Sequence, residues 1–337
     1  MNVGRGFFVH VGLFVLASAS AVAVWTRDEQ PKALVQTEAT VWPGRPADVA
    51  KVVFESKNRK VLLEAKTDKL GAYYLGTLER EATPPPVNLD AGAPPPAPGG
   101  PKTKTDFVSV GVAQKLVESL APLKALRALG KIPEDRAAEF GLADPEGTLT
   151  VTIGGVERKL VLGATTPGGG DRYVREPQTG ETYVIDGAAV RDLDTAESRL
   201  VERELHGWKE AEVSTAELSA GGKKRQIVRG GPEGKRFWAD PAAADQKDET
   251  AANFMSKLDR LRPTDYVMVE PAGKQDVLRV EYAAGSSLGF LELVRVPAAD
   301  PAGKPEYFVR TERTRLYAKV PAQTAEQVEQ DLESVLK

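Results

Sequence analysis

The order of strand-like and helix-like patterns in residues 42–204 recurs in residues 205–337. Each half opens with short β-rich runs, continues with a helical pattern and two further groups of strands, and ends with a helix. Single helices packed on an antiparallel sheet make an α+β fold. We therefore predict an α+β protein with two tandem copies of an antiparallel-sheet-plus-helices unit.

Matching apolar spacings connect the two halves. Separations of four and three residues occur in both, at Leu116, Leu120 and Leu123 and then at Phe254, Leu258 and Leu261. Such spacing predicts one buried face of a helix in each half. Ser109 is the expected N-cap of the first helix, and Thr324 with Gln327 forms a predicted capping box for the last helix of the chain.

Turn signals separate the predicted strands. Apolar and polar residues alternate from Thr148 to Ile153, and Gly154-Gly155 then precedes a second run that ends at Leu162. Two glycines between alternating runs predict a hairpin with a two-residue turn. A different interruption occupies residues 83–105, which are rich in Pro and Gly; we predict a surface loop there, because such a segment cannot form a packed core.

The N-terminal residues 1–25 contain an apolar run from Phe7 to Val24, preceded by Arg5 and followed by Trp25. A bilayer-spanning helix needs about 20 mostly apolar residues, so we predict one membrane anchor with its N-terminus in the cytoplasm. The alternative is a signal peptide cleaved after a small-residue site within 17–21. Residues 26–41 are then a juxtamembrane linker. Both interpretations place the body outside the cytoplasm, in the periplasm for a single-pass protein of a bacterial inner membrane.

Composition limits the classes of partner and cofactor. The net charge is −3 and the chain has no cysteine. Without a basic footprint we expect no nucleic-acid partner. Without cysteine the chain forms no disulfide, and clustered Cys or His ligands for zinc are missing. We expect no metal and no cofactor.

Catalytic residues are difficult to assign. His206 is the only histidine outside the apolar run, and we interpret it as a linker or turn residue rather than a general base. Asp192, Asp194 and Glu197 are too loosely spaced for a calcium loop and are expected on a solvated helix surface. Hydrolysis by a pair of Asp or Glu carboxylates is an alternative, although the sequence does not single out one pair. We therefore predict no catalytic residue and no enzyme.

A glycine-rich segment and several aromatic residues have simpler interpretations. Gly163 to Gly170 lacks the Lys-Ser/Thr of a phosphate loop, and the carboxylate of Asp171 follows it, so we expect a turn between strands. The larger aromatic residues are expected in cores rather than on a sugar-binding surface. These residues are Trp208, Phe237, Trp238, Tyr183 and Tyr317.

Three features together resemble a known bacterial family. They are Phe140-Gly141-Leu142, the hairpin Thr148 to Leu162, and the Thr-Pro-Gly loop that leads into Tyr173-Val174. The chain resembles the domain of unknown function 4340 family in layout over residues 49–330 and specifically over Phe140 to Ile185. The resemblance implies one N-terminal membrane helix and association with gliding-motility-type ABC transport components. It implies no established activity and no catalytic residues.

These observations favour a non-enzymatic, membrane-anchored extracytoplasmic module that binds envelope or transporter proteins. One alternative is an exported protein that binds a small molecule or glycan in the groove between the repeats. A carboxylate-dependent hydrolase is another.

Overall fold

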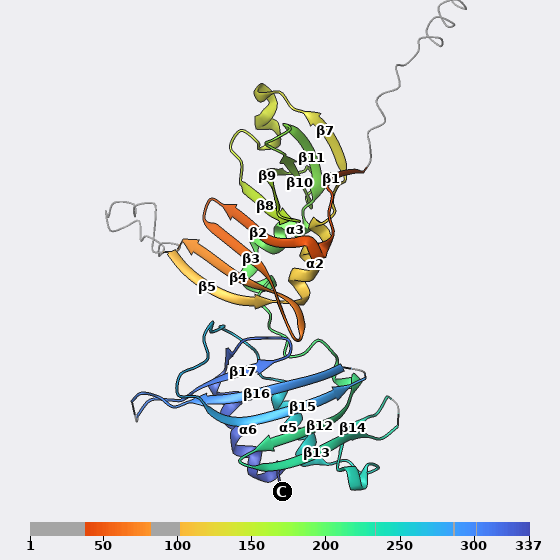
Figure 1. Ribbon diagram of the computed structural model, residues 1–337, viewed down its shortest axis with the longest axis vertical. Helices are drawn as coiled ribbons and strands as arrows, with labels where there is room; N and C mark the ends of the chain where they lie inside the picture. Colours follow the sequence, from red (N-terminus) through yellow and green to blue (C-terminus); the bar gives the residue numbers. More distant parts are fainter. Residues whose placement is uncertain (1–37, 82–101, 233, 286, 301) are drawn as a thin grey trace, which may run out of the picture.

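The computed structural model describes residues 38–81, 102–232, 234–285, 287–300 and 302–337. The predicted anchor or signal segment, 1–25, lies outside these residues, as does most of the predicted linker, 26–41. No helix within the described ranges is long and apolar enough to cross a membrane. Two large antiparallel sheets, each with its own helices, lie one beyond the other along the long axis of the molecule (Figure 1). The fold class is α+β.

The first sheet has nine strands in the order β5-β4-β3-β2-β8-β9-β10-β11-β7. Their bounds are β2 Val49–Ser56, β3 Arg59–Asp68, β4 Gly71–Glu81, β5 Lys102–Ser109, β7 Arg127–Lys131, β8 Gly147–Ile153, β9 Val156–Thr165, β10 Asp171–Arg175 and β11 Glu181–Asp186. A separate two-stranded sheet pairs β1 (Ala39–Trp42) with β6 (Leu123–Ala125). These strands, with the helices that cover them, form the first sheet unit.

The second sheet has seven strands in the order β14-β13-β12-β15-β16-β17-β18. Their bounds are β12 Val213–Ala220, β13 Lys223–Gly230, β14 Phe237–Ala239, β15 Gln275–Ala284, β16 Ser287–Val296, β17 Glu306–Thr311 and β18 Ala318–Val320. With its two helices it forms the second sheet unit. Without β5 and β7, the first sheet has the order β4-β3-β2-β8-β9-β10-β11. In both sheets, therefore, the first three strands along the chain lie in reverse order and the next four follow in chain order.

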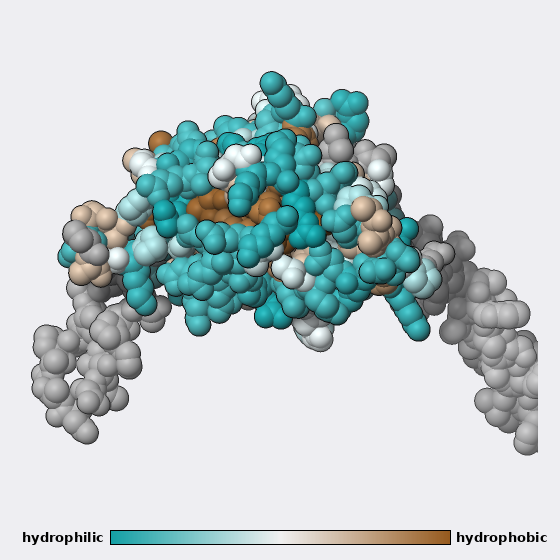
Figure 2. All heavy atoms as spheres, turned by 90° about the horizontal axis from the view of Figure 1, so that it is seen from below, coloured by the Kyte–Doolittle hydropathy of each residue, from teal (hydrophilic) through white to brown (hydrophobic). Residues whose placement is uncertain are grey.

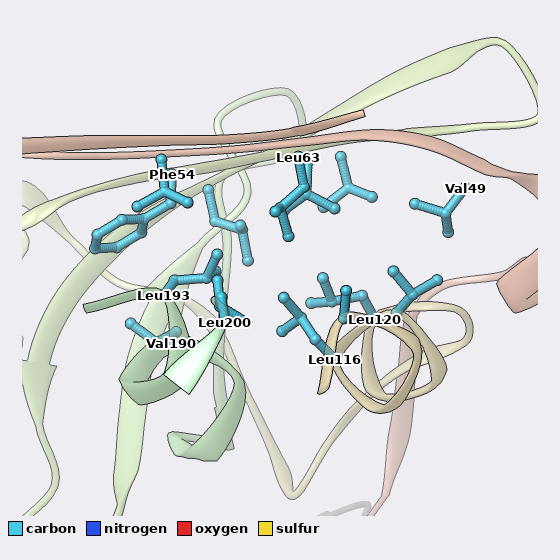
Figure 3. Packing of buried hydrophobic residues seen from close by; sticks show 14 of the residues in the cluster. Val49, Phe54, Leu63, Leu116, Leu120, Val190, Leu193 and Leu200 are labelled. Atoms are coloured by element: carbon cyan, nitrogen blue, oxygen red, sulfur yellow. The ribbon is translucent and has the colours of Figure 1, made fainter. Parts of the chain in front are cut away.

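Helices cover one face of the first sheet. They are α2 (Gly111–Leu120), α3 (Ala188–Asp194) and α4 (Ala196–Arg199). Leu116 and Leu120 on α2, and Leu193 on α3, point toward the strand residues Phe54 and Leu63 (Figure 3). Each fully buried side chain of this kind stabilises the fold by about 1.5–3 kcal/mol relative to exposure.

Two helices, α5 (Glu249–Leu258) and α6 (Ala322–Val335), cover one face of the second sheet. The carboxylate of Asp248 caps α5 by accepting a 2.9 Å hydrogen bond from the amide of Ala251. Phe254 and Leu258 are buried, as the spacing predicts, but Leu261 lies beyond the end of the helix. Short 3-10 helices complete the described elements: η1 Pro46–Asp48, η3 Glu134–Phe140, η4 Glu210–Glu212 and η5 Pro241–Ala243.

The predicted hairpin between Thr148 and Leu162 is confirmed. β8 and β9 pair across Gly154 and Gly155, whose φ angles are +57° and +80°. Residues without a β-carbon reach this region of backbone conformation at little cost, which is why the Gly-Gly pair permits the tight turn.

Four local predictions are wrong. Ser109 is buried at the end of β5 and does not cap α2. Thr324 lies within the first turn of α6, which begins after Pro321 without a side-chain cap. The predicted loop 83–105 ends early, because β5 begins at Lys102 and pairs with β4. The last residues of the predicted linker 26–41 belong to β1. The proposed boundaries, 42–204 and 205–337, stay predictions.

Candidate functional site

The turn between β17 and β18 carries two arginines that reach the first sheet unit. Arg315 adopts a left-handed conformation, with φ at +62°. Its Nη1 lies 2.6 Å from the Oδ1 of Asp68, and its Nη2 donates a 2.9 Å hydrogen bond to the carbonyl of Leu70. Its guanidinium also lies 5.6 Å from the ring centre of Tyr73. The side chain is only 6% exposed, so Arg315 is held against the β3–β4 turn.

Arg313 forms the second contact of this kind. Its Nη2 lies 3.1 Å from the Oε2 of Glu202, whose side chain is 5% exposed. The same guanidinium lies against Gly111, where a β-carbon would approach Nη2 to 2.5 Å. The Glu202 carbonyl accepts a 2.7 Å hydrogen bond from the hydroxyl of Tyr266. Burial, followed by the charge of Glu202, raises the pKa of that phenol.

These contacts fill the junction between the units. Tyr266 and Ala318, which belong to the second half of the chain, pack in the hydrophobic core of the first unit. Arg203 donates a 3.2 Å hydrogen bond to the carbonyl of Pro263 beside them. A buried ion pair keeps its geometry because separating the charges leaves each desolvated without a partner. The described side chains therefore join the two units into one body.

His206 lies in the segment that connects the units, as expected, and it is buried there. Its side chain is 8% exposed, and its Nδ1 lies 2.8 Å from the Oε1 of Glu312. The imidazole stacks on Trp208 at 4.0 Å between ring centres, and Tyr282 meets it edge-on at 4.8 Å. Glu312 is fixed in turn by a 2.9 Å hydrogen bond from the amide of Phe290.

The chemistry of this His206 cluster is that of a packed polar core. The Nε2 of His206, the Nε1 of Trp208 and the hydroxyl of Tyr282 are buried and make no hydrogen bond within the described ranges. A general base must reach the proton of a substrate, and this imidazole is enclosed. Asp259 nearby has its pKa raised to about 6, mainly by burial and then by Glu210, against the opposing charge of His206.

A charged cleft lies where the β2–β3 turn faces the end of α3. One cavity of 480 Å³ is lined by Arg59, Arg80, Asp194 and Arg203, with Leu78 as its apolar part. Asp194 is half-buried and ends α3. Burial raises the pKa of its carboxyl, while Arg172 and Arg59 oppose the rise. Asp194 therefore lies on the helix surface, as expected, but at the wall of a cleft and with its side chain half-buried.

Asp194 also borders a second cavity of 310 Å³, on the side of β9 and β10. Arg172 lies in its wall with a side chain that is 10% exposed, and it pairs with Glu146. It also donates a 3.3 Å hydrogen bond to the carbonyl of Gly163. By contrast, Glu197 is exposed and pairs with Arg80 at 2.6 Å on the rim of the first cavity. Sequence spacing could not identify this cleft, because β3 and β4 supply one wall and the segment around α3 and α4, far along the chain, supplies the other.

Comparison with known families decides what this chain is related to. The model of the family described as "Domain of unknown function (DUF4340)" matches residues 113–288, which is 176 of 337 residues. The chain belongs to the DUF4340 family. No curated protein and no solved structure matches it. The resemblance inferred from Phe140 to Ile185 is thereby confirmed as family membership.

The DUF4340 match runs from α2, through the connecting segment, to the beginning of β16. It includes Asp194, Glu202 and His206, whereas Arg59 and the arginines of the β17–β18 turn lie outside it. The Arg313–Glu202 pair, the His206 cluster and the charged cleft therefore each combine residues from within the matched region with residues from outside it, whereas the Arg315–Asp68 contact lies wholly outside it.

Other predicted positions in this DUF4340 protein are structural. The segment Gly163 to Gly170 ends β9 and turns into β10, and Asp171 opens that strand. Trp238 and Tyr317 are 3% and 4% exposed, and Trp208 packs against the second core. Tyr183 packs against the first core and Phe237 is partly buried in β14. Within the described ranges, no group of three or more His, Cys, Asp or Glu could hold a metal ion.

Proposed function

We propose that this protein is a non-enzymatic binding module outside the cytoplasm, held at the bacterial inner membrane by residues 1–25, and that its body binds protein partners of an ABC-type transport system. The observation that carries the proposal is the filled junction, where Arg315 pairs with Asp68 and Arg313 with Glu202. A body with its two parts joined in this way can hold two surfaces in a constant relative orientation.

The shared order of strands supports a duplicated scaffold. We infer that the two sheet units are copies of one ancestral unit, with β5 and β7 added to the first. Duplication of a sheet that is covered by helices on one face gives two sheet faces of similar size, and partner proteins commonly use such surfaces.

The uncovered face of the second sheet has the character of a binding surface. Glu292 accepts hydrogen bonds there from Arg310 on β17, at 2.8 Å, and from Arg279 on β15. The hydroxyl of Tyr317 lies 3.2 Å from the same carboxylate, and Arg310 lies 4.9 Å from the ring of Tyr317. Arg is enriched at protein interfaces, and the side chains of Arg279 and Arg310 are 46% and 38% exposed on this face, whereas Tyr317 is buried.

The end of the molecule formed by the second sheet unit shows a mixed surface. Figure 2 shows one apolar area there, surrounded by hydrophilic residues. An apolar area with a polar rim is typical of a surface that meets another protein.

The location can be tested with single cysteines, because the chain has none of its own. We expect Glu157→Cys, at an exposed position in the β8–β9 hairpin, to react with a membrane-impermeant maleimide in intact cells. Asn2→Cys, which precedes the apolar run, should react only after the membrane is permeabilised. Equal protection of both positions in intact cells would place the body in the cytoplasm and refute the proposal.

Partner binding can be tested by photo-cross-linking in cells. A photoreactive residue at Glu281, on the uncovered face of the second sheet, should form adducts with a membrane-embedded transport protein. The matched control is the same residue at Glu333, an exposed position on α6. Absence of adducts from several positions on the uncovered face, in full-length protein that remains in the membrane, would contradict the proposal.

A further inference from the structure

We propose that the 480 Å³ cavity beside Asp194 binds a small zwitterion, a molecule that carries one carboxylate and one ammonium group, such as a free amino acid. The carboxylate of the ligand would lie on the guanidinium of Arg59, and its ammonium group on the carboxylate of Asp194. This site is in the first sheet unit and not in the groove between the units, and it does not depend on partner binding.

The first argument is that two opposite charges line one cavity without contacting each other. Arg59 has no ion-pair partner or side-chain hydrogen bond among the residues that the structure describes, and its Nε is buried. Asp194 likewise receives no hydrogen bond or ion pair from described residues. Burial raises the pKa of Asp194, and the charges of Arg172 and then Arg59 oppose that rise through space. A ligand that contacts both groups would satisfy two desolvated charges at once.

The second argument is that the neighbouring charges already have partners. Arg80 pairs with Glu197 at 2.6 Å, and Arg172 pairs with Glu146. Arg203 donates to the carbonyl of Pro263. Arg59 and Asp194 are therefore the two charged side chains of this cleft that have neither an ion pair nor a hydrogen bond among the described residues.

The chemistry of the two groups specifies the ligand. A guanidinium presents parallel N–H donors that match a carboxylate, whereas an ionised carboxyl group only accepts hydrogen bonds and favours a cation. Leu78 supplies an apolar part of the wall for the carbon chain between the two ligand groups. The cavity volume falls within the range of about 300–1,000 Å³ that is usual for small-molecule sites.

The test uses calorimetric titration of the full-length protein in detergent with a series of ω-amino acids. Glycine, β-alanine, γ-aminobutyrate and 6-aminohexanoate place the two charges at increasing separations, and L-glutamate and L-lysine represent free amino acids. Butyrate and butylamine each lack one charge. We expect at least one zwitterion to bind saturably with a Kd of about 1 mM or lower, and both single-charge analogues to bind at least tenfold more weakly.

Variants locate the binding. Arg59→Gln and Asp194→Asn should each raise the Kd of the best zwitterion at least tenfold. Lys57→Gln changes an exposed residue of the same turn that is paired with Asp144, and should leave the Kd unchanged. Thermal unfolding of each variant reports its folding. If Asp194→Asn fails to fold, Arg59→Gln and Arg59→Lys decide the result.

Three outcomes would overturn the proposal. They are no saturable binding by any zwitterion in the series, an unchanged Kd in the folded Arg59 and Asp194 variants, and binding of butyrate or butylamine as tight as that of the best zwitterion.

Discussion

The guanidinium of Arg315 and the carboxylate of Asp68 lie 2.6 Å apart although 247 residues separate them in the chain. The pair joins the β17–β18 turn of the second sheet unit to the β3–β4 turn of the first. The arginine side chain is almost fully buried but the aspartate side chain is 36% exposed, so solvent screens this pair in part. This junction and the buried groups of the second half of the chain lead to five predictions.

Arg315→Ala should weaken the junction. The substitution removes the contact with Asp68 and the hydrogen bond to the carbonyl of Leu70, and we expect a loss of about 1–3 kcal/mol in the free energy of unfolding. Spin labels on two introduced cysteines, one in each sheet unit, should show a broader distance distribution. Arg45→Ala, which removes an exposed ion pair with Asp48, is the control and should change little. An unchanged distance distribution in Arg315→Ala would show that the pair does not orient the units.

The conformation of Arg315 gives a second test at the same position. Arg315→Gly loses the same contacts as the alanine variant. The left-handed conformation costs a residue with a β-carbon about 1–2 kcal/mol, and glycine does not have this cost. We expect the glycine variant to be more stable than the alanine variant in urea unfolding. The opposite order would mean that the backbone at this position relaxes when the arginine is removed.

Glu202 and Arg313 should be energetically coupled. A double-mutant cycle with Glu202→Gln and Arg313→Ala should give an interaction energy of about 0.5–3 kcal/mol, since the two charges are in contact and Glu202 is buried. Urea unfolding of the four proteins measures it. Additive effects within about 0.3–0.5 kcal/mol would show that the pair does not stabilise the junction.

Gly289→Ala should disturb the His206 cluster. A β-carbon at this position would lie 2.9 Å from the Nε1 of Trp208 and 3.0 Å from the Oε2 of Glu312. We expect a loss of about 1–3 kcal/mol from overpacking, and a change in the near-ultraviolet circular dichroism of the tryptophan. Gly207→Ala, where the nearest atom would be 3.4 Å away, is the matched control. Equal effects of the two substitutions would contradict the packing argument.

Asp259→Asn should increase stability at neutral pH. The folded-state pKa of about 6 lies above the ordinary value of 3.8 for an aspartate, so the folded state binds this proton more tightly than the unfolded state does. For this group, stability is greatest below pH 4, falls as the pH rises to about 6.5, and is then constant. Asparagine does not ionise, so the variant does not lose this stability as the pH rises. Its free energy of unfolding at pH 7 should exceed that of the wild type by about 1–3 kcal/mol.

The measurement for Asp259 is the free energy of urea unfolding between pH 4 and pH 7.5. Glu333→Gln, on the exposed surface of α6, controls for the removal of one negative charge. A wild-type protein and an Asp259→Asn variant with parallel pH profiles would show that the carboxyl group titrates alike in the folded and unfolded states.

Local patterns predicted the elements whose own residues determine their structure. The hairpin of β8 and β9 follows from alternation and from two glycines that accept positive φ angles. The apolar spacing in α2 and α5 predicted which faces are buried, although Leu123 and Leu261 lie beyond the ends of these helices. β5 was missed because much of this edge strand is exposed, and its Lys and Thr residues resemble a loop. The cap assigned to Ser109 was wrong because β5 extends to that residue, and the cap assigned to Thr324 was wrong because α6 already begins at Ala322.

The sequence by itself determined the α+β class, the family, most of the strands, the lack of cysteine and the scarcity of histidine, because these depend on residue type and on short-range periodicity. The tertiary structure alone decided the pairing of Arg315 with Asp68, the enclosure of His206 and the cavity between Arg59 and Asp194. Each of these brings together residues more than a hundred positions apart, and their charges and burial depend on how the sheets and helices close around them.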